Sequence, residues 1–155
     1  MMNYRVEEKV SFIVSGYIRE YASGQEAQEN IYRFWLDFNE YNNGQYLMGL
    51  KNNQLDGLVG LCIPRQSGAM DYLIGVSVNK AINGCETIEL PVTKYIVFDA
   101  VGKVPESIHR AMKEIHQQVL PKLDITLKNA PFFELYHSGD TEDDNYVTEL
   151  WFPIE

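Results

Sequence analysis

The hydrophobic positions of the first forty residues change from a strand-like run to a helical period. Residues 10–18 are rich in β-branched and aromatic side chains and predict a strand. Ser23, with Glu26 three residues later, predicts a helix start with a capping box. The apolar residues that follow recur at three- and four-residue steps, and these are Ile31, Phe34, Trp35, Phe38 and Tyr41. This spacing predicts one helix face that ends near Tyr41, before the helix-stopping Asn42-Asn43-Gly44.

The next forty residues predict mainly extended structure. Residues 45–50 are expected to form a short extended piece, followed by a polar connection. Residues 58–63 predict a strand that Pro64 ends, and residues 72–78 predict its hairpin partner across a turn at 65–68.

The second half of the chain follows the same order. Residues 93–101 are a β-branched run that predicts a strand, and a helix is expected between Pro105 and Pro121. Residues 132–137 and 146–154 predict two further strands, joined by an acidic turn at 138–144.

Two short alignments support a duplication of this plan. Phe12-Ile13-Val14 aligns with Tyr95-Ile96-Val97, and Asp71-Tyr72-Leu73 aligns with Asn145-Tyr146-Val147. We therefore predict a single α+β domain over residues 1–155, built from two βαββ modules at about 4–80 and 85–155. Because each module is too small to bury both of its faces, the two should pair about a pseudo-twofold axis.

Composition excludes several classes of function. The chain has 155 residues, 45% of them hydrophobic, which is typical of a globular domain. Its formal net charge of −9 argues against direct binding to nucleic acid or to an anionic membrane, because phosphates would be repelled. The N-terminus has no apolar signal segment, and no stretch approaches the roughly 18 apolar residues of a membrane span. We expect a cytoplasmic protein whose two cysteines, Cys62 and Cys85, are reduced thiols.

Glu149 is the first candidate for binding chemistry. It lies in the last predicted strand, where alternation places Val147, Glu149 and Trp151 on one face and mainly apolar residues on the other. A carboxylate in a strand buried on both sides is costly unless it is paired. Glu149 is therefore either an edge or lysine-paired glutamate, or a buried acid that awaits a cationic ligand.

Aromatic residues supply the second part of this candidate site. They make up 12% of the chain, and tyrosine and tryptophan suit a pocket because their faces attract cations. The aromatic candidates, chosen for face and character, are Trp35, Tyr46, Phe132 and Trp151.

Catalytic, metal and cofactor motifs are absent from the sequence. His109 and His116 are seven residues apart, whereas a metal pair prefers a spacing of four. The acidic turn lacks the glycine and final glutamate of an EF-hand loop, and no nucleotide-binding glycine loop is present. We expect no metal, no cofactor and no catalytic residue.

The layout resembles the GyrI-like small-molecule-binding domain, the effector-binding module of some AraC-type and MerR-type transcription regulators. The resemblance covers nearly the whole chain and rests on the tandem βαββ plan, on Gly16 at the end of the first strand, and on two motifs, Phe133-Glu134-Leu135-Tyr136-His137 and Glu149-Leu150-Trp151-Phe152-Pro153-Ile154. It implies a curved antiparallel sheet with two long helices around a central pocket. It also implies that Glu149 meets the charge of a lipophilic cation, with Tyr136 beside it.

The resemblance implies a stand-alone protein that binds amphipathic, cationic small molecules in an aromatic pocket. The DNA-binding domain of the regulators has no counterpart in this sequence, so we expect no operator binding by the chain itself. Two alternatives stay open. One is an acidic interaction or inhibitor module that acts on a DNA-handling protein such as gyrase, and the other is a small-molecule hydrolase that uses the pocket glutamate as a base.

Overall fold

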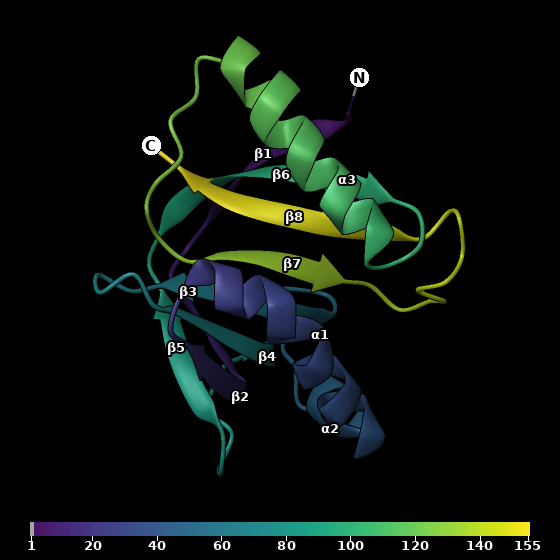
Figure 1. The fold of residues 1–155 in the computed structure, drawn as a ribbon. Helices are drawn as coiled ribbons and strands as arrows, with labels where there is room; N and C mark the ends of the chain where they lie inside the picture. The colour runs from purple at the N-terminus through teal and green to yellow at the C-terminus, as the bar shows by residue number, and fades with distance from the viewer. Residues whose placement is uncertain (1) are drawn as a thin grey trace.

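The computed structural model describes residues 2–155 and has eight strands in one antiparallel sheet with two long helical segments (Figure 1). The strands are β1 (Tyr4–Lys9), β2 (Phe12–Tyr21), β3 (Leu58–Pro64), β4 (Met70–Val78), β5 (Glu86–Leu90), β6 (Thr93–Val101), β7 (Phe132–Tyr136) and β8 (Val147–Ile154). The helices are α1 (Gly24–Glu40), α2 (Asn43–Met48) and α3 (Glu106–Glu114), and α3 continues as a π-helical turn (Ile115–Val119) and a 3-10 turn (Leu120–Lys122). The predicted α+β class is confirmed. No helix of this described part is both long and apolar enough to cross a membrane.

Helix α1 forms where its capping signal predicts it. The Ser23 side chain accepts a hydrogen bond from the backbone N–H of Glu26 at 3.1 Å, and the Glu26 carboxylate accepts one from the backbone N–H of Ala22. The helical spacing then buries Phe34 and Phe38 against the sheet.

Three elements differ from the sequence-based expectation. Residues 45–50 do not form an extended piece, because Asn43–Met48 form helix α2 with Leu47 fully buried. Strands β1 and β5, which the hydrophobic pattern does not predict, form the two edges of the sheet.

The strand order is β1-β6-β8-β7-β3-β4-β2-β5. The order is symmetric between the two halves of the chain. If β1, β2, β3 and β4 exchange places with β5, β6, β7 and β8 respectively, the order read backwards is the same as the order read forwards. Each half therefore contributes its first strand to the edge of the other half, since β1 pairs with β6 and β5 pairs with β2. This order is what a duplicated ββαββ unit related by a pseudo-twofold axis between β3 and β7 would give.

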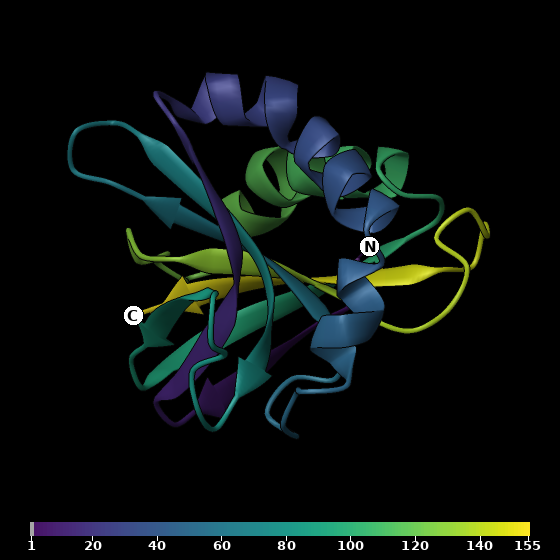
Figure 2. The same ribbon diagram turned by 90° about the horizontal axis from the view of Figure 1, so that it is seen from below.

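Both long helices cover the same face of the sheet (Figures 1 and 2). Helix α1 packs on β2 and β4, and α3 packs on β6. The two halves meet where the central strands β3 and β7 pair, and we call this junction the seam.

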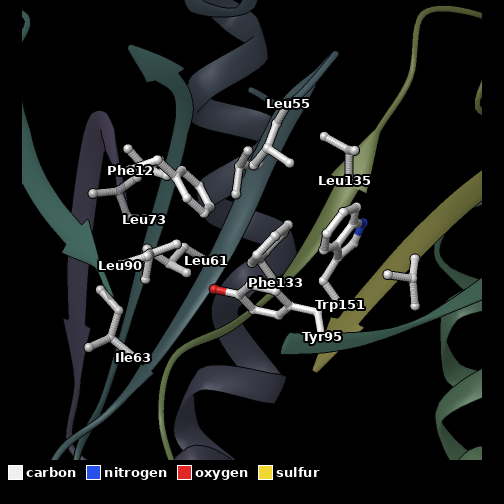
Figure 3. Packing of buried hydrophobic residues seen from close by; sticks show 13 residues of the cluster. Phe12, Leu55, Leu61, Ile63, Leu73, Leu90, Tyr95, Phe133, Leu135 and Trp151 are labelled. Atoms are coloured by element: carbon white, nitrogen blue, oxygen red, sulfur yellow. The ribbon is translucent and has the colours of Figure 1, made fainter. Parts of the chain in front are cut away.

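The other face of the sheet curves around a core of its own. A single cluster of buried side chains joins strands from β2 to β8, and it includes Phe12, Leu61, Tyr95, Phe133 and Trp151. Figure 3 shows the rings of Tyr95, Phe133 and Trp151 packed together, and the Phe133 and Trp151 ring centroids are 5.2 Å apart. Two separate hydrophobic clusters lie on the helix-covered face, one under each long helix.

Candidate functional site

Strand β7 places a glutamate on the helix-covered face at the seam between the two halves. Alternation along β7 buries Phe133 and Leu135 in the core of the opposite face. Phe132, Glu134 and Tyr136 therefore face the helices, and each remains half-buried rather than fully enclosed.

Two tyrosines hold the Glu134 carboxylate. The hydroxyl of Tyr72, from β4, donates to Glu134 Oε1 at 2.9 Å, and the hydroxyl of Tyr136 donates to the same oxygen at 2.7 Å. The indole N–H of Trp35, from α1, donates to the Tyr72 hydroxyl oxygen at 3.0 Å. We call these four residues, Trp35, Tyr72, Glu134 and Tyr136, the Glu134 cluster.

A glycine in β3 makes this geometry possible. Strand β3 lies between β4 and β7, and Gly60 pairs directly with Glu134. A Cβ atom at Gly60 would overlap the Tyr72 hydroxyl and would lie 2.9 Å from Glu134 Oε1. The absence of a side chain at this position lets Tyr72 reach across β3 to the carboxylate.

Aromatic rings pack against one another on the face of the sheet that carries the Glu134 carboxylate. The Trp35 and Tyr136 ring centroids are 5.0 Å apart in an edge-to-face arrangement, and Phe132 stacks on Phe152 at 5.7 Å. Phe132 packs against the hydrophobic clusters of both halves. Two aromatic pairs and one acid therefore share this face of the sheet.

The Glu134 carboxylate has no counter-ion among the described residues. None of the ion pairs within residues 2–155 includes it. Burial raises the pKa of Glu134, and this effect exceeds the lowering by the hydrogen bonds from Tyr136 and Tyr72 and by the charge of His109. Burial, and then the neighbouring carboxylate, also raise the pKa of both tyrosine hydroxyls, so both remain protonated donors.

Glu149 lies on the opposite face and is fully partnered. It pairs with Leu135 across β7 and β8, while Glu134 pairs with Leu150, so the two glutamates point to opposite sides of the sheet. Glu149 Oε1 accepts hydrogen bonds from Arg5 at 3.1 Å and from the Trp151 indole at 2.9 Å, and His137 lies 3.1 Å from Oε2. Burial would raise the pKa of Glu149, but the contacts with His137, Trp151 and Arg5 together lower it.

The six residues expected from sequence to line one site therefore do not come together. Trp35, Phe132 and Tyr136 share the seam with Glu134, whereas Glu149 and Trp151 lie on the other face. Tyr46 is 54% exposed on α2 and takes no part in the hydrogen bonds of the Glu134 cluster.

Sequence reasoning overlooked Glu134, Tyr72 and Gly60 as site residues. Glu134 carries the same local signal as Glu149, since it is a carboxylate in a strand that is apolar on both faces. Only the tertiary partners separate the two glutamates.

Two solvent-open hollows lie away from this cluster, beside α3. One, of about 560 Å³, is lined by residues that include Asp99, Ser107 and Arg110. The other, of about 590 Å³, is lined by residues that include Lys103, Arg110 and Asp144. Neither is lined by any of the six residues expected from the sequence or by Glu134.

Comparison with known proteins supports an effector-binding role for this fold. The sequence profile of a family described as integron-associated effector binding protein matches residues 5–154. A proposed bacterial transcription regulation protein from Staphylococcus aureus MU50 is 35% identical, with a TM-score of 0.92 over 100% of this chain and 99% of that chain. SAV2435, solved bound to tetraphenylphosphonium, is 36% identical, with a TM-score of 0.92 over 99% of this chain and 94% of that chain.

A more distant structure shares the fold alone. An integron cassette protein from the mobile metagenome of Vibrio cholerae is 17% identical, with a TM-score of 0.67 over 98% of this chain and 95% of that chain. No curated protein matches the chain in sequence. The resemblance to effector-binding domains that the sequence predicts is confirmed by these matches.

Proposed function

Because this chain belongs to the family of integron-associated effector-binding proteins, we propose that it binds amphipathic aromatic cations, with Glu134 as the counter-ion. The observation that carries the proposal is a half-buried carboxylate that has two tyrosine donors and aromatic neighbours but no cationic partner among residues 2–155. Burying such a charge without a partner costs stability, and groups of this kind are typical of binding sites.

The surroundings of Glu134 suit a cation with apolar groups. Trp35 and Tyr136 present π systems that attract positive charge, and Phe132 adds apolar surface. The relative bound to tetraphenylphosphonium supports a lipophilic cation as the ligand class. The ion pair and apolar burial both favour binding, and a net binding free energy of about −8 kcal/mol corresponds to micromolar affinity.

The two glutamates provide a matched test of this site. Tetraphenylphosphonium and tetraphenylborate have the same shape and opposite charge, and both can be titrated by calorimetry into wild type, Glu134→Gln and Glu149→Gln. We expect wild type to bind the phosphonium and not the borate. Glu134→Gln should weaken phosphonium binding by about 30-fold or more, because removing one partner of a desolvated charge pair costs about 2–5 kcal/mol.

The control variant should behave differently. Glu149→Gln should change phosphonium affinity by less than about threefold, because Arg5 already pairs with Glu149 and Glu149 lies on the opposite face of the sheet. A larger loss in Glu149→Gln than in Glu134→Gln would move the site to the other face of the sheet. Unchanged binding in both variants would rule out charge pairing.

A further inference from the structure

The two oxygens of the Glu134 carboxylate have different hydrogen-bonding environments. Oε1 accepts hydrogen bonds from both the Tyr72 and the Tyr136 hydroxyls. Among the described residues, Oε2 accepts none, and it is not one of the side-chain atoms shut off from solvent without a partner. The carboxylate therefore has one oxygen that accepts two hydrogen bonds, and one oxygen that accepts none from the described residues and is not closed off completely from solvent.

The direction of the hydrogen bonds keeps Oε1 saturated. The Trp35 indole can only donate, so the Tyr72 hydroxyl accepts from it and directs its own proton to Glu134 Oε1. Tyr136 lies two residues from Glu134 on the same face of β7 and supplies the second donor. Two donors on one carboxylate oxygen leave little room for a third.

We infer that the preferred ligand is an aromatic cation that carries an N–H group, such as a protonated aromatic amine or amidine, and that this N–H donates to Glu134 Oε2. This inference rests on the proposed function. A quaternary cation would leave Oε2 covered by apolar atoms and without a donor, which loses the stabilisation of a charge-assisted hydrogen bond. The ligand's N–H groups, rather than its charge alone, would then determine selectivity.

A pair of dyes that differ only in the substituent on the ring nitrogen tests this choice. Acridine orange is protonated on its ring nitrogen at neutral pH, and its 10-methyl derivative keeps the ring system and the charge but has no N–H. Calorimetry at pH 7.5 should show that wild type binds acridine orange at least about tenfold more tightly than the methyl derivative, because hydrogen bonds to charged groups are worth roughly that factor. The 10-ethyl derivative serves as the steric control and should bind like the methyl derivative.

Glu149→Gln provides a control for a general effect of removing an acid. Glu149 lies on the opposite face of the sheet, so the preference for the N–H dye should persist in this variant. In Glu134→Gln, the preference should fall toward equal binding of the two dyes.

Each contrary outcome identifies what has failed. Equal affinity of wild type for acridine orange and its methyl derivative, with both weakened in Glu134→Gln, would overturn this inference and leave the proposed function standing. If the ethyl derivative binds more weakly than the methyl derivative, steric crowding explains the preference and the inference is overturned. Binding of tetraphenylphosphonium without binding of either dye would also overturn the inference. Absence of binding by all of these cations would overturn the proposed function as well.

Discussion

Glu134 and Glu149 lie one register step apart on neighbouring strands, yet the structure treats them in opposite ways. Glu134 pairs with Leu150, and Glu149 pairs with Leu135, so one acid faces the helices and the other faces the curved core. Glu149 is held by Arg5, His137 and the Trp151 indole, and its pKa is lowered. Glu134 is held only by neutral hydroxyls, and its pKa is raised.

This difference separates an acid that is paired within the fold from the acid that we propose as the binding residue. Glu149 joins β8 to β1 and to the residue that follows β7, so its charge contributes to the fold. The charge of Glu134 does not contribute in this way, because nothing cationic within residues 2–155 pairs with it. A charge that weakens the free protein can be stabilised by a ligand, and this is the property expected of a cation site.

The largest change in stability should come from a substitution that fills the space beside Glu134. Gly60→Ala would place a methyl group where the hydroxyl of the fully buried Tyr72 lies, so the Tyr72 side chain would have to shift. We expect a loss of about 1–3 kcal/mol in the free energy of unfolding, the usual cost of overpacking, and loss of the Tyr72–Glu134 hydrogen bond. Urea denaturation measures the first effect, and phosphonium titration measures its consequence for binding.

Gly24→Ala is the matched control for that substitution. No atom lies within 4 Å of a Cβ built at Gly24, so its stability should stay within about 0.5 kcal/mol of wild type or rise slightly. If Gly60→Ala were as stable as Gly24→Ala, the Tyr72 hydroxyl would not be confined against β3 as described.

Neutralising each glutamate in turn should change stability with opposite signs. At pH 7, Glu149→Gln should lower the free energy of unfolding by about 1–2 kcal/mol, because it removes charge-assisted hydrogen bonds. Glu134→Gln should raise the free energy of unfolding at the same pH, because it removes an unpaired charge and keeps an oxygen that can accept from the tyrosines. Urea melts of the three proteins without ligand measure both changes.

The pH dependence sharpens this test. The stabilisation by Glu149 is complete above the ordinary glutamate pKa of 4.5 and is lost as the pH falls through its lowered pKa in the folded state. The cost of ionised Glu134 is complete above its raised pKa and disappears as the pH falls toward 4.5. At pH 4, the gain from Glu134→Gln should be gone, while part of the deficit of Glu149→Gln remains. Two variants that shift stability in the same direction at pH 7 would contradict the assignment.

The smallest effect is spectroscopic and uses the two tryptophans of the chain, one on each face. Trp35 belongs to the Glu134 cluster and Trp151 contacts Glu149. Tetraphenylphosphonium should change the emission of Trp151→Phe, in which only Trp35 remains, by a modest fraction. It should leave the emission of Trp35→Phe unchanged at the same site occupancy. A ligand response from Trp151 alone would indicate binding on the other face.

Much of the fold could be predicted from the sequence because local patterns dictated it. The strand at Thr93–Val101 and helix α1 follow from β-branched runs, helical spacing and a capping box, all of which act within a few residues. Strand β1 escaped prediction because Arg5, Glu7 and Lys9 give an edge strand a polar character. Helix α2 escaped because it is six residues long and is stabilised by burial of Leu47 rather than by its own pattern.

The choice between the two glutamates could not be made from local pattern. The two-residue alternation of a strand shows that Glu134 and Glu149 each have apolar neighbours on both faces of their strands. This local pattern is the same for both glutamates, so it cannot distinguish them. Which acid is neutralised depends on Arg5, 144 residues away from Glu149, and which acid meets tyrosine depends on Tyr72, 62 residues away from Glu134. Residue type and spacing determined the elements and the class of chemistry, since these depend on short-range sterics and burial. The register of β7 against β8 and the missing side chain at Gly60 decided which carboxylate has a cationic partner and which has only tyrosine donors. Only the tertiary structure decides this, because a charge is paired or unpaired through contacts that the folded chain brings together.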